Sequence, residues 1–182
     1  MVNVACLKYH LMKDNLKSVF KGKALSLNLE QVTYPDGSNG ILEIIRHPGG
    51  SAVVAINEKN EICLLRQYRY AADGWIWEIP AGRIEEIEDP LQTAKRELLE
   101  EAGVSAETWS SIGIIYPSPG ICDERIYLYM ASDLVTNTMA HEDDEFIEIH
   151  WLPVEDAISL IKEGEILDAK TIIALYNTQS CK

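Results

Sequence analysis

Cysteine pairs, long apolar runs and positive charge are all scarce in this 182-residue sequence, and each scarcity excludes a class of protein. The four cysteines lie far apart without a C-x-x-C pair, which argues against a zinc site and against a disulfide framework. Nowhere do 18 apolar residues run together, and charged residues interrupt the N-terminal apolar stretch, so we expect neither membrane spanning nor secretion. These absences together predict a cytoplasmic protein with reduced thiols.

The shortage of positive charge limits which partners the protein can bind. The sequence has 16 Lys and Arg residues against 29 Asp and Glu residues, for a formal net charge of −13. Such a chain lacks the positive field that binding along a phosphate backbone requires, so we expect no nucleic-acid partner. An anionic substrate would then need local neutralisation, for which a divalent cation is the obvious candidate.

The remaining composition is that of an ordinary globular protein, with 47% hydrophobic and 25% charged residues. A chain of this length holds one domain, with room for a small arm. Near the N-terminus, the leucines of residues 24–30 alternate with polar residues, a turn follows at 34–37, and an extended pattern resumes at 41–46. We therefore assign residues 1–47 to an antiparallel β arm and residues 48–182 to the main domain.

Strand and helix patterns follow one another through the main domain. Two short apolar runs, 51–56 and 62–68, flank a polar turn and are predicted to form a hairpin. Further strand patterns cover 75–79, 112–116, 126–131 and 146–151, and helical patterns cover 153–162 and 168–177. The sequence thus predicts an α/β fold in which helices cover a mixed sheet.

One helix, predicted from residue 90 to residue 102, has unusually well-marked ends. Asp89 is a candidate N-cap and Pro90 stands at the first helical position. Gln92 completes a capping-box pattern, and Gly103 follows the C-terminal end. Helical spacing places four apolar side chains on one stripe, which is the predicted buried face: Leu91, Ala94, Leu98 and Ala102.

The predicted outward face of this helix carries an unfavourable cluster of acids. Glu97, Glu100 and Glu101 are spaced three and four residues apart, so their carboxylates are neighbours. Like charges at these spacings cost about 0.2–0.5 kcal/mol per pair, and the helix dipole disfavours anions near the C-terminal end by about 0.3–1 kcal/mol. One interpretation is a solvated acidic face. The other is a hard divalent ion with oxygen ligands, which would reverse the sign of the penalty.

A longer pattern surrounds these glutamates. Gly82, Glu88 and the run Arg96-Glu-Leu-Leu-Glu-Glu-Ala-Gly-Val104 are spaced as in the Nudix box, and every defining position is filled. The sequence therefore resembles the Nudix hydrolase family. The resemblance implies a Nudix fold, which is an α/β/α sandwich with a mixed sheet. It also implies hydrolysis of a nucleoside diphosphate linked to another group, with Mg²⁺ or Mn²⁺ as cofactor.

The same resemblance implies roles for individual residues. Glu97, Glu100 and Glu101, together with the backbone carbonyl of Ala81, would hold the metal. Arg96 would orient these carboxylates through charge-assisted hydrogen bonds rather than touch the substrate. We count Arg96 and Glu100 among the catalytic residues.

Segments outside the box resemble the ADP-ribose pyrophosphatase branch of the family: 66–69, 77–82, 118–120 with 123–124, 142–148 and 164–172. This resemblance implies cleavage of ADP-ribose to AMP and ribose 5-phosphate. It makes Arg69 a candidate ligand of the diphosphate, places Pro119 and Gly120 beside the terminal ribose, and makes Glu124 a candidate acceptor for a ribose hydroxyl. Each has a plainer alternative, respectively a surface ion pair, an ordinary turn and a solvated carboxylate.

A general base is expected in the acidic loop 141–145. In this branch a glutamate of that loop is thought to remove a proton from the attacking water. Glu145 is our candidate, because it is the last carboxylate of the loop before Phe146 and so the least free to move. The other three acids of the loop are interpreted as solvated charge.

Two other functions and one assembly complete the set of hypotheses. The leaving group could belong to another nucleotide sugar such as GDP-mannose, because loops outside the box select it. A Nudix domain could also bind a nucleotide metabolite as a sensor, without hydrolysing it. The arm has edge strands that need to be covered. In this branch the adenine base of the substrate often lies against the arm and the partner subunit, so we expect a homodimer.

Overall fold

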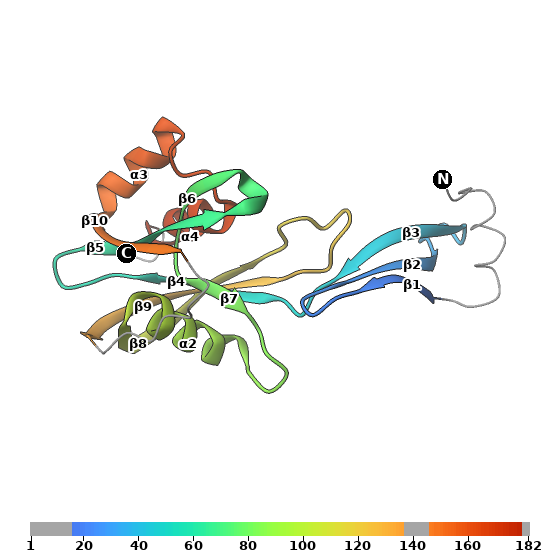
Figure 1. Ribbon diagram of the computed structural model, residues 1–182, viewed down its shortest axis with the longest axis horizontal. Coiled ribbons are helices and arrows are strands. Elements are labelled where there is room, and N and C mark those ends of the chain that lie inside the picture. The colour runs from blue at the N-terminus through green and yellow to red at the C-terminus, as the bar shows by residue number, and fades with distance from the viewer. Residues whose placement is uncertain (1–15, 137–145, 180–182) are drawn as a thin grey trace. The chain divides into compact units, whose positions relative to one another are not determined.

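The computed structural model describes residues 16–136 and 146–179, and the chain divides into two compact units. The first unit contains the chain up to Pro48 together with 118–124, and the second contains 49–117 and everything from Arg125 onward. Figure 1 shows their elements by label, and each unit is described on its own.

The first unit is built on a three-stranded antiparallel sheet. Its strands are β1 (Leu16–Lys21), β2 (Ser26–Thr33) and β3 (Asn39–Arg46), paired in the order β1-β2-β3. The turn between β2 and β3 contains Gly37, whose φ of 84° is a conformation that glycine adopts without strain. The antiparallel N-terminal arm expected from the alternating leucines is confirmed.

A segment distant in sequence, 118–124, joins this sheet next to β3. The Ile45 N–H donates to the Ile121 carbonyl at 2.8 Å, and the Asp123 N–H donates to the Ile45 carbonyl at 3.1 Å. Ile45 and Cys122 thereby form a parallel bridge. No local sequence pattern predicts this pairing, because it depends on where the fold brings residues 118–124.

The second unit holds two sheets. The four-stranded sheet has the order β7-β4-β9-β8, in which β4 and β9 are parallel and the other neighbours antiparallel. The three-stranded antiparallel sheet has the order β10-β5-β6. The strands are β4 (Gly50–Ala55), β5 (Glu61–Arg69), β6 (Gly74–Glu78), β7 (Ala81–Arg83), β8 (Val104–Ile115), β9 (Ile126–Thr136) and β10 (Ile147–Pro153).

Helices cover these sheets on both sides. On one side lies α2 (Pro90–Ala102), and on the other lie α3 (Val154–Glu163) and α4 (Ala169–Gln179), while a short 3₁₀ helix, Tyr70–Ala72, follows β5 (Figure 1). Alternate residues of β4 separate two apolar clusters. Val53 packs in the cluster that contains Leu98 of α2, and Val54 packs in the cluster that contains Leu175 of α4. The predicted α/β/α sandwich is confirmed.

The predicted hairpin over 51–56 and 62–68 is wrong. A tight turn does join the two runs, with Ile56 and Ile62 forming a single antiparallel bridge. Beyond that bridge β4 and β5 diverge into different sheets, and each pairs with two other strands. Every residue of β4 is buried, as expected of a strand covered on both faces. An apolar run of this kind does not indicate which strands will pair with it.

The helix α2 begins and ends where the sequence predicts. The Asp89 side chain accepts the Gln92 N–H at 2.9 Å, the Gln92 side chain accepts the Asp89 N–H at 3.2 Å, and Gly103 has a φ of 66°. The Ser51 hydroxyl also donates to the Pro90 carbonyl at 2.6 Å, which ties the first turn to β4. Of the predicted stripe, Ala94, Leu98 and Ala102 are buried and Leu91 is half-buried.

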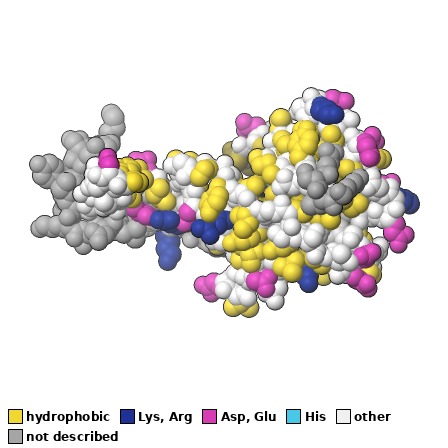
Figure 2. Space-filling view, turned by 180° about the vertical axis from the view of Figure 1, so that it is seen from behind, with side chains coloured by type: hydrophobic (Ala, Val, Ile, Leu, Met, Phe, Trp, Pro, Cys, Tyr) yellow, Lys and Arg dark blue, Asp and Glu magenta, His cyan; other side chains and the backbone are white. Residues whose placement is uncertain are grey.

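Hydrophobic side chains are also found on the surface of the second unit, as Figure 2 shows for one of its faces. The exposed ones include Ile114 and Tyr116 around the end of β8, and Ile173 and Tyr176 on α4. Among the residues that the structure describes, no helix combines the length and the apolar character needed to cross a membrane.

Candidate active site

The first component of the site joins β7 to the C-terminal half of α2. The Ala81 N–H donates to Oε2 of Glu101 at 2.8 Å. Glu101 is only 3% exposed, so the outward orientation expected for this glutamate is wrong. Its carboxylate points inward because a backbone amide of the neighbouring strand satisfies it, which offsets part of the cost of burying a charge.

The second component is the close approach of Glu97 to the backbone of β7. A Cβ atom added at Gly82 would overlap the Glu97 carboxylate group. Gly82 therefore provides room for this carboxylate to lie directly against the strand. Glu97 and Glu101 consequently flank the same short segment, with Glu97 at Gly82 and Glu101 at the Ala81 amide.

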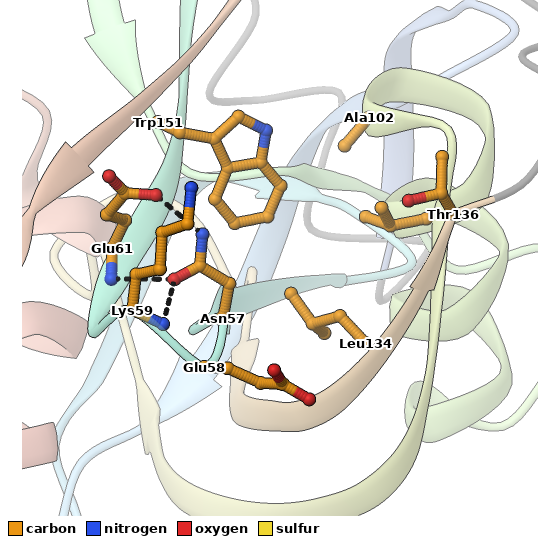
Figure 3. A pocket seen from close by; sticks show the side chains of 9 residues that line it. Asn57, Glu58, Lys59, Glu61, Ala102, Leu134, Thr136 and Trp151 are labelled. Carbon is orange, nitrogen blue, oxygen red and sulfur yellow. Dashed lines mark hydrogen bonds between the residues drawn. The ribbon is translucent and has the colours of Figure 1, made fainter.

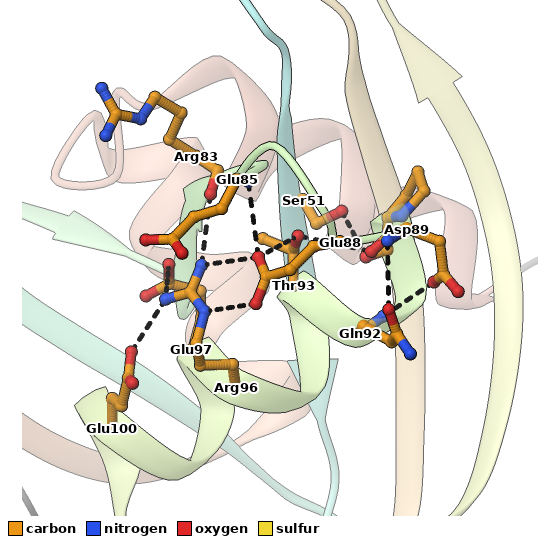
Figure 4. Close-up of polar contacts among 11 residues, drawn as sticks. Ser51, Arg83, Glu85, Glu88, Asp89, Gln92, Thr93, Arg96, Glu97 and Glu100 are labelled. Carbon is orange, nitrogen blue, oxygen red and sulfur yellow. Dashed lines mark hydrogen bonds and ion pairs between the residues drawn. The ribbon is translucent and has the colours of Figure 1, made fainter. Parts of the chain in front are cut away.

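The third component is Arg96, which holds several oxygen atoms at once (Figure 4). Its Nε donates to Oε1 of Glu88 at 2.7 Å and its Nη2 to Oε2 of Glu88 at 3.0 Å, a bidentate pair. Its Nη1 donates to Glu97 at 2.7 Å and to Glu100 at 2.8 Å. Nη2 also reaches the Arg83 carbonyl at 3.2 Å. One guanidinium thus organises three carboxylates and the strand β7.

The electrostatics of the site follow from these contacts. Hydrogen bonds from Arg96, and a further one from the Thr93 hydroxyl, lower the pKa of Glu88 to about 2, against the opposing effect of burial. Hydrogen bonds to Glu88 and the other glutamates raise the pKa of Arg96 further above its already high value. Arg96 therefore offsets much of the repulsion that the sequence predicts among the acids.

The chemistry of these groups fits a hard divalent cation. Within 16–136 and 146–179, no three His, Cys, Asp or Glu side chains converge on one point as they stand, since Arg96 lies between Glu97 and Glu100. Two carboxylates nevertheless lie along the same segment of β7, where Gly82 leaves room for Glu97 and the Ala81 amide binds Glu101. Carboxylate and carbonyl oxygens are the ligands that Mg²⁺ and Mn²⁺ prefer.

Arg69, the candidate diphosphate ligand, lies at the end of β5 and contacts Glu78 of β6. Its Nη2 donates to Oε2 of Glu78 at 2.7 Å, and its Nε lies 3.2 Å from both carboxylate oxygens. Glu78 is nearly buried, whereas the Arg69 side chain is 40% exposed. The carboxylate thus fixes the direction of the guanidinium while leaving it accessible to solvent.

The other candidate substrate residues lie in the first unit. Pro119 and Gly120 belong to the turn in which the Ile121 N–H donates to the Ser118 carbonyl, and no atom would meet a Cβ added at Gly120 within 4 Å. Glu124 lies 3.4 Å from Nδ1 of His47. Glu145, the candidate general base, lies outside the described residues.

A pocket of about 600 Å³ opens at the C-terminal end of α2 (Figure 3). Its wall combines the polar turn between β4 and β5 with Leu134, Trp151 and the residues that follow Glu101 in the chain, Ala102 and Val104. Asn57 shapes the turn by accepting the Lys59 and Glu61 amides, each at 2.9 Å. Among the residues that the structure describes, none of the site residues predicted from the sequence lines this pocket.

Residues 46–175 match the family described as NUDIX domain, which is more than two thirds of the chain and includes the whole site around Arg96. The chain belongs to the NUDIX domain family. The resemblance predicted from Gly82, Glu88 and the helix glutamates is confirmed.

Two relatives of this Nudix chain are similar over nearly their full length. An ADP-ribose pyrophosphatase of Bacillus subtilis (strain 168) is 38% identical, covering 90% of this chain and 89% of the relative. A methanol dehydrogenase activator of Bacillus methanolicus is 40% identical with the same coverage. The solved structure of an ADP compounds hydrolase superposes with a TM-score of 0.79 at 18% identity, covering 92% of this chain and 91% of the other. That last likeness establishes the Nudix fold alone.

Two residues at the site, Glu88 and Glu78, had no role assigned from the sequence. Glu88 makes the bidentate contact with Arg96 and so sets the orientation of its guanidinium. Its place in the Nudix box pattern was the signal that could have identified it. Glu78 lies in the segment 77–82 that resembles the ADP-ribose pyrophosphatase branch, but its contact with Arg69 across the β5–β6 pair could not be predicted from that segment alone.

Proposed function

We propose that this chain is a divalent-metal-dependent Nudix pyrophosphohydrolase that cleaves ADP-ribose to AMP and ribose 5-phosphate. The observation that carries the proposal is the set of glutamates that Arg96 and β7 hold beside Gly82. The Bacillus subtilis relative, whose name gives ADP-ribose as its substrate, supports the choice of leaving group.

The metal would be held by Glu97, Glu100, Glu101 and the carbonyl of Ala81. A bound Mg²⁺ or Mn²⁺ polarises the diphosphate oxygens and lowers the pKa of a bound water. Arg96 holds Glu97 and Glu100 together through Nη1 and so limits the rotamer freedom that metal binding would otherwise cost.

The remaining proposed roles belong to substrate binding and proton transfer. Arg69, oriented by Glu78, presents a planar fork to the diphosphate. Pro119, Gly120 and Glu124 are proposed to contact the terminal ribose. Glu145 is proposed to take the proton of the attacking water.

A substrate panel tests the proposal. Purified protein with Mg²⁺ is incubated with ADP-ribose, GDP-mannose and UDP-glucose, and the products are separated by chromatography. We expect AMP and ribose 5-phosphate from ADP-ribose, and ¹⁸O from labelled water in one of the two products identifies the phosphorus that is attacked. Rapid cleavage of a nucleotide sugar with ADP-ribose left intact would overturn the choice of substrate.

A variant at Glu101 separates hydrolysis from mere binding. Glu101→Gln keeps the size of the side chain and removes the negative charge, so turnover should fall by about 10²-fold or more if the carboxylate holds the ion. The control is Glu107→Gln in β8, which changes an exposed glutamate that is not a proposed metal ligand. A wild-type protein that binds ADP-ribose with Mg²⁺ present and releases no product would instead support the sensor hypothesis.

We also propose that the protein is a cytoplasmic homodimer held through its arm. Val19 and Phe20 of the edge strand β1 are 52% and 57% exposed, at the point where the register of the β1–β2 pairing shifts. Exposed apolar side chains on an edge strand favour a partner surface. Light scattering on the eluting protein should give twice the monomer mass, and Val19→Ser with Phe20→Ser should reduce it; a wild-type monomer at every concentration would refute the dimer.

A further inference from the structure

The segment that leads into the site is held from behind by the first turn of α4. The Ile79 N–H donates to the Thr171 hydroxyl at 2.9 Å, two residues before Ala81. Thr171 is fully buried, and its hydroxyl in turn donates to Oδ2 of Asp168 at 2.6 Å. One hydroxyl therefore connects the strand end to the N-terminus of α4, across 92 residues of sequence.

Asp168 is the cap of this helix as well as a partner of the hydroxyl. Its Oδ2 accepts the Thr171 N–H at 3.0 Å, which satisfies a donor that α4 leaves open in its first turn. The same oxygen lies 3.0 Å from Nζ of Lys170. Asp168 thus binds both the backbone N–H and the hydroxyl of Thr171, which fixes the position of the hydroxyl.

Lys170 links this cap to Glu78. Its ammonium lies 3.4 Å from Oε1 of Glu78, the carboxylate that also binds Arg69. The Lys170 side chain is 11% exposed and Glu78 is 5% exposed, so the pair is shielded from water. Two cations, Arg69 and Lys170, and two carboxylates, Glu78 and Asp168, form a set with no net charge, which is the condition under which buried charges are tolerated.

Three hydrogen bonds from different parts of the chain therefore hold the 78–82 segment. The Thr171 hydroxyl binds the Ile79 amide, the Val53 amide donates to the Pro80 carbonyl at 2.9 Å, and Glu101 binds the Ala81 amide. The carbonyl of Ala81 and the approach of Glu97 at Gly82 both depend on where this backbone lies. A shift of the segment would move one proposed metal ligand and the space available to another.

We propose that Asp168, Lys170 and Thr171 form a positioning cluster that sets the backbone of the metal site and the orientation of Arg69. The expected effect of this cluster on turnover rests on the proposed metal-dependent hydrolysis, whereas its expected effect on metal binding does not. Thr171 acts on the Ala81 carbonyl through Ile79, and Lys170 acts on Arg69 through Glu78. None of the three is proposed to contact the substrate.

The first test removes the Thr171 hydroxyl and measures Mn²⁺ affinity by electron paramagnetic resonance, without substrate. Thr171→Val should weaken Mn²⁺ binding about 10- to 100-fold, and Thr171→Ser should restore it. Thr178→Val is the matched control, because Thr178 is also buried on α4 but donates to the Leu175 carbonyl within the helix. Equal Mn²⁺ affinity in Thr171→Val and Thr178→Val would overturn the proposal.

The second test uses Lys170 and stays available if Thr171→Val does not fold. Lys170→Met should raise the KM for ADP-ribose about tenfold with a smaller change in kcat, because Arg69 loses its fixed orientation. Lys162→Met, at an exposed lysine of α3, is the control and should leave both constants unchanged. A KM for Lys170→Met equal to that of the control would contradict the role of Lys170. If the wild type binds Mn²⁺ and leaves ADP-ribose intact, the proposed function fails, whereas the comparison of Mn²⁺ affinities still decides the positioning role.

Discussion

The carboxylate of Glu97 occupies the space in which a side chain at Gly82 would begin. The φ of Gly82 is not in the left-handed region, so the conformation of its backbone alone does not demand glycine. The requirement comes from the neighbour. A glycine in β7 and a glutamate in α2, fifteen residues apart, therefore define one part of the proposed metal site together.

This relationship predicts the effect of adding one methyl group. Gly82→Ala should displace Glu97 and lower both Mn²⁺ affinity and ADP-ribose hydrolysis by about 10- to 100-fold. Gly74→Ala is the matched control, because a Cβ at Gly74 meets nothing within 4 Å and its φ is not positive. Titration with Mn²⁺ and initial rates on both variants check the prediction, and equal values for the two would contradict it.

Replacement of Arg96 by lysine should show that geometry matters as well as charge. Lysine keeps the positive charge but cannot hold Glu88 in a bidentate pair while also binding Glu97 and Glu100. We expect Arg96→Lys to lose about 10-fold or more in Mn²⁺ affinity and in kcat. Lys95→Arg, at the exposed neighbouring position, is the control. Wild-type Mn²⁺ binding in Arg96→Lys would show that any cation suffices there.

The depressed pKa of Glu88 predicts a dependence of stability on pH. Its pKa is about 2 in the folded protein and near the usual 4.5 when unfolded, so folding is favoured by ionised Glu88. This contribution is complete above about pH 5 and is lost as the pH falls from about 4.5 towards 2. Urea unfolding of the wild type and Glu88→Gln should show a constant difference in free energy between pH 7 and 5 that shrinks by pH 3. A difference independent of pH would contradict this assignment.

The cap of α2 makes a prediction about stability that is separate from catalysis. Asp89→Ala removes the acceptor of the Gln92 amide and should lower the free energy of unfolding by about 1 kcal/mol. Asp89→Asn keeps a side-chain oxygen at the same place and should retain most of that stability. Urea denaturation at pH 7 distinguishes the two. Equal stability of the alanine variant and the wild type would mean that the capping box contributes little.

Local signals were sufficient for α2 and for the family. Asp89, Pro90 and Gly103 act on residues within one helical turn of themselves, so the limits of the helix could be predicted without knowledge of the fold. The spacing of Glu97, Glu100 and Glu101 is likewise a property of one helix. The arm was also predictable, since its strands are joined by a short turn and pair in sequence order.

Pairings between distant segments were not predictable in this way. β4 and β5 look like a hairpin because a tight turn joins two apolar runs, but their partners come from β7, β9, β6 and β10. Similarly, 118–124 carries no periodicity that would direct it to Ile45. A strand that is buried on both faces lacks the alternation of polar and apolar residues that would indicate its partner strands. The entropy of closing a long loop depends on the length of the loop and not on any particular residue, so it leaves no pattern in the sequence.

The sequence by itself determined the chemistry of this protein: an acidic helix with marked ends, a glycine before it and a spacing that belongs to the Nudix family. Only the tertiary structure decided how these acids coexist. It turned Glu101 inward to the Ala81 amide, gave Glu97 the space at Gly82, and anchored the strand end through Thr171. The reason is physical, because helix periodicity is a local property, whereas the partner of a buried charge is whichever group the rest of the chain brings within hydrogen-bond distance.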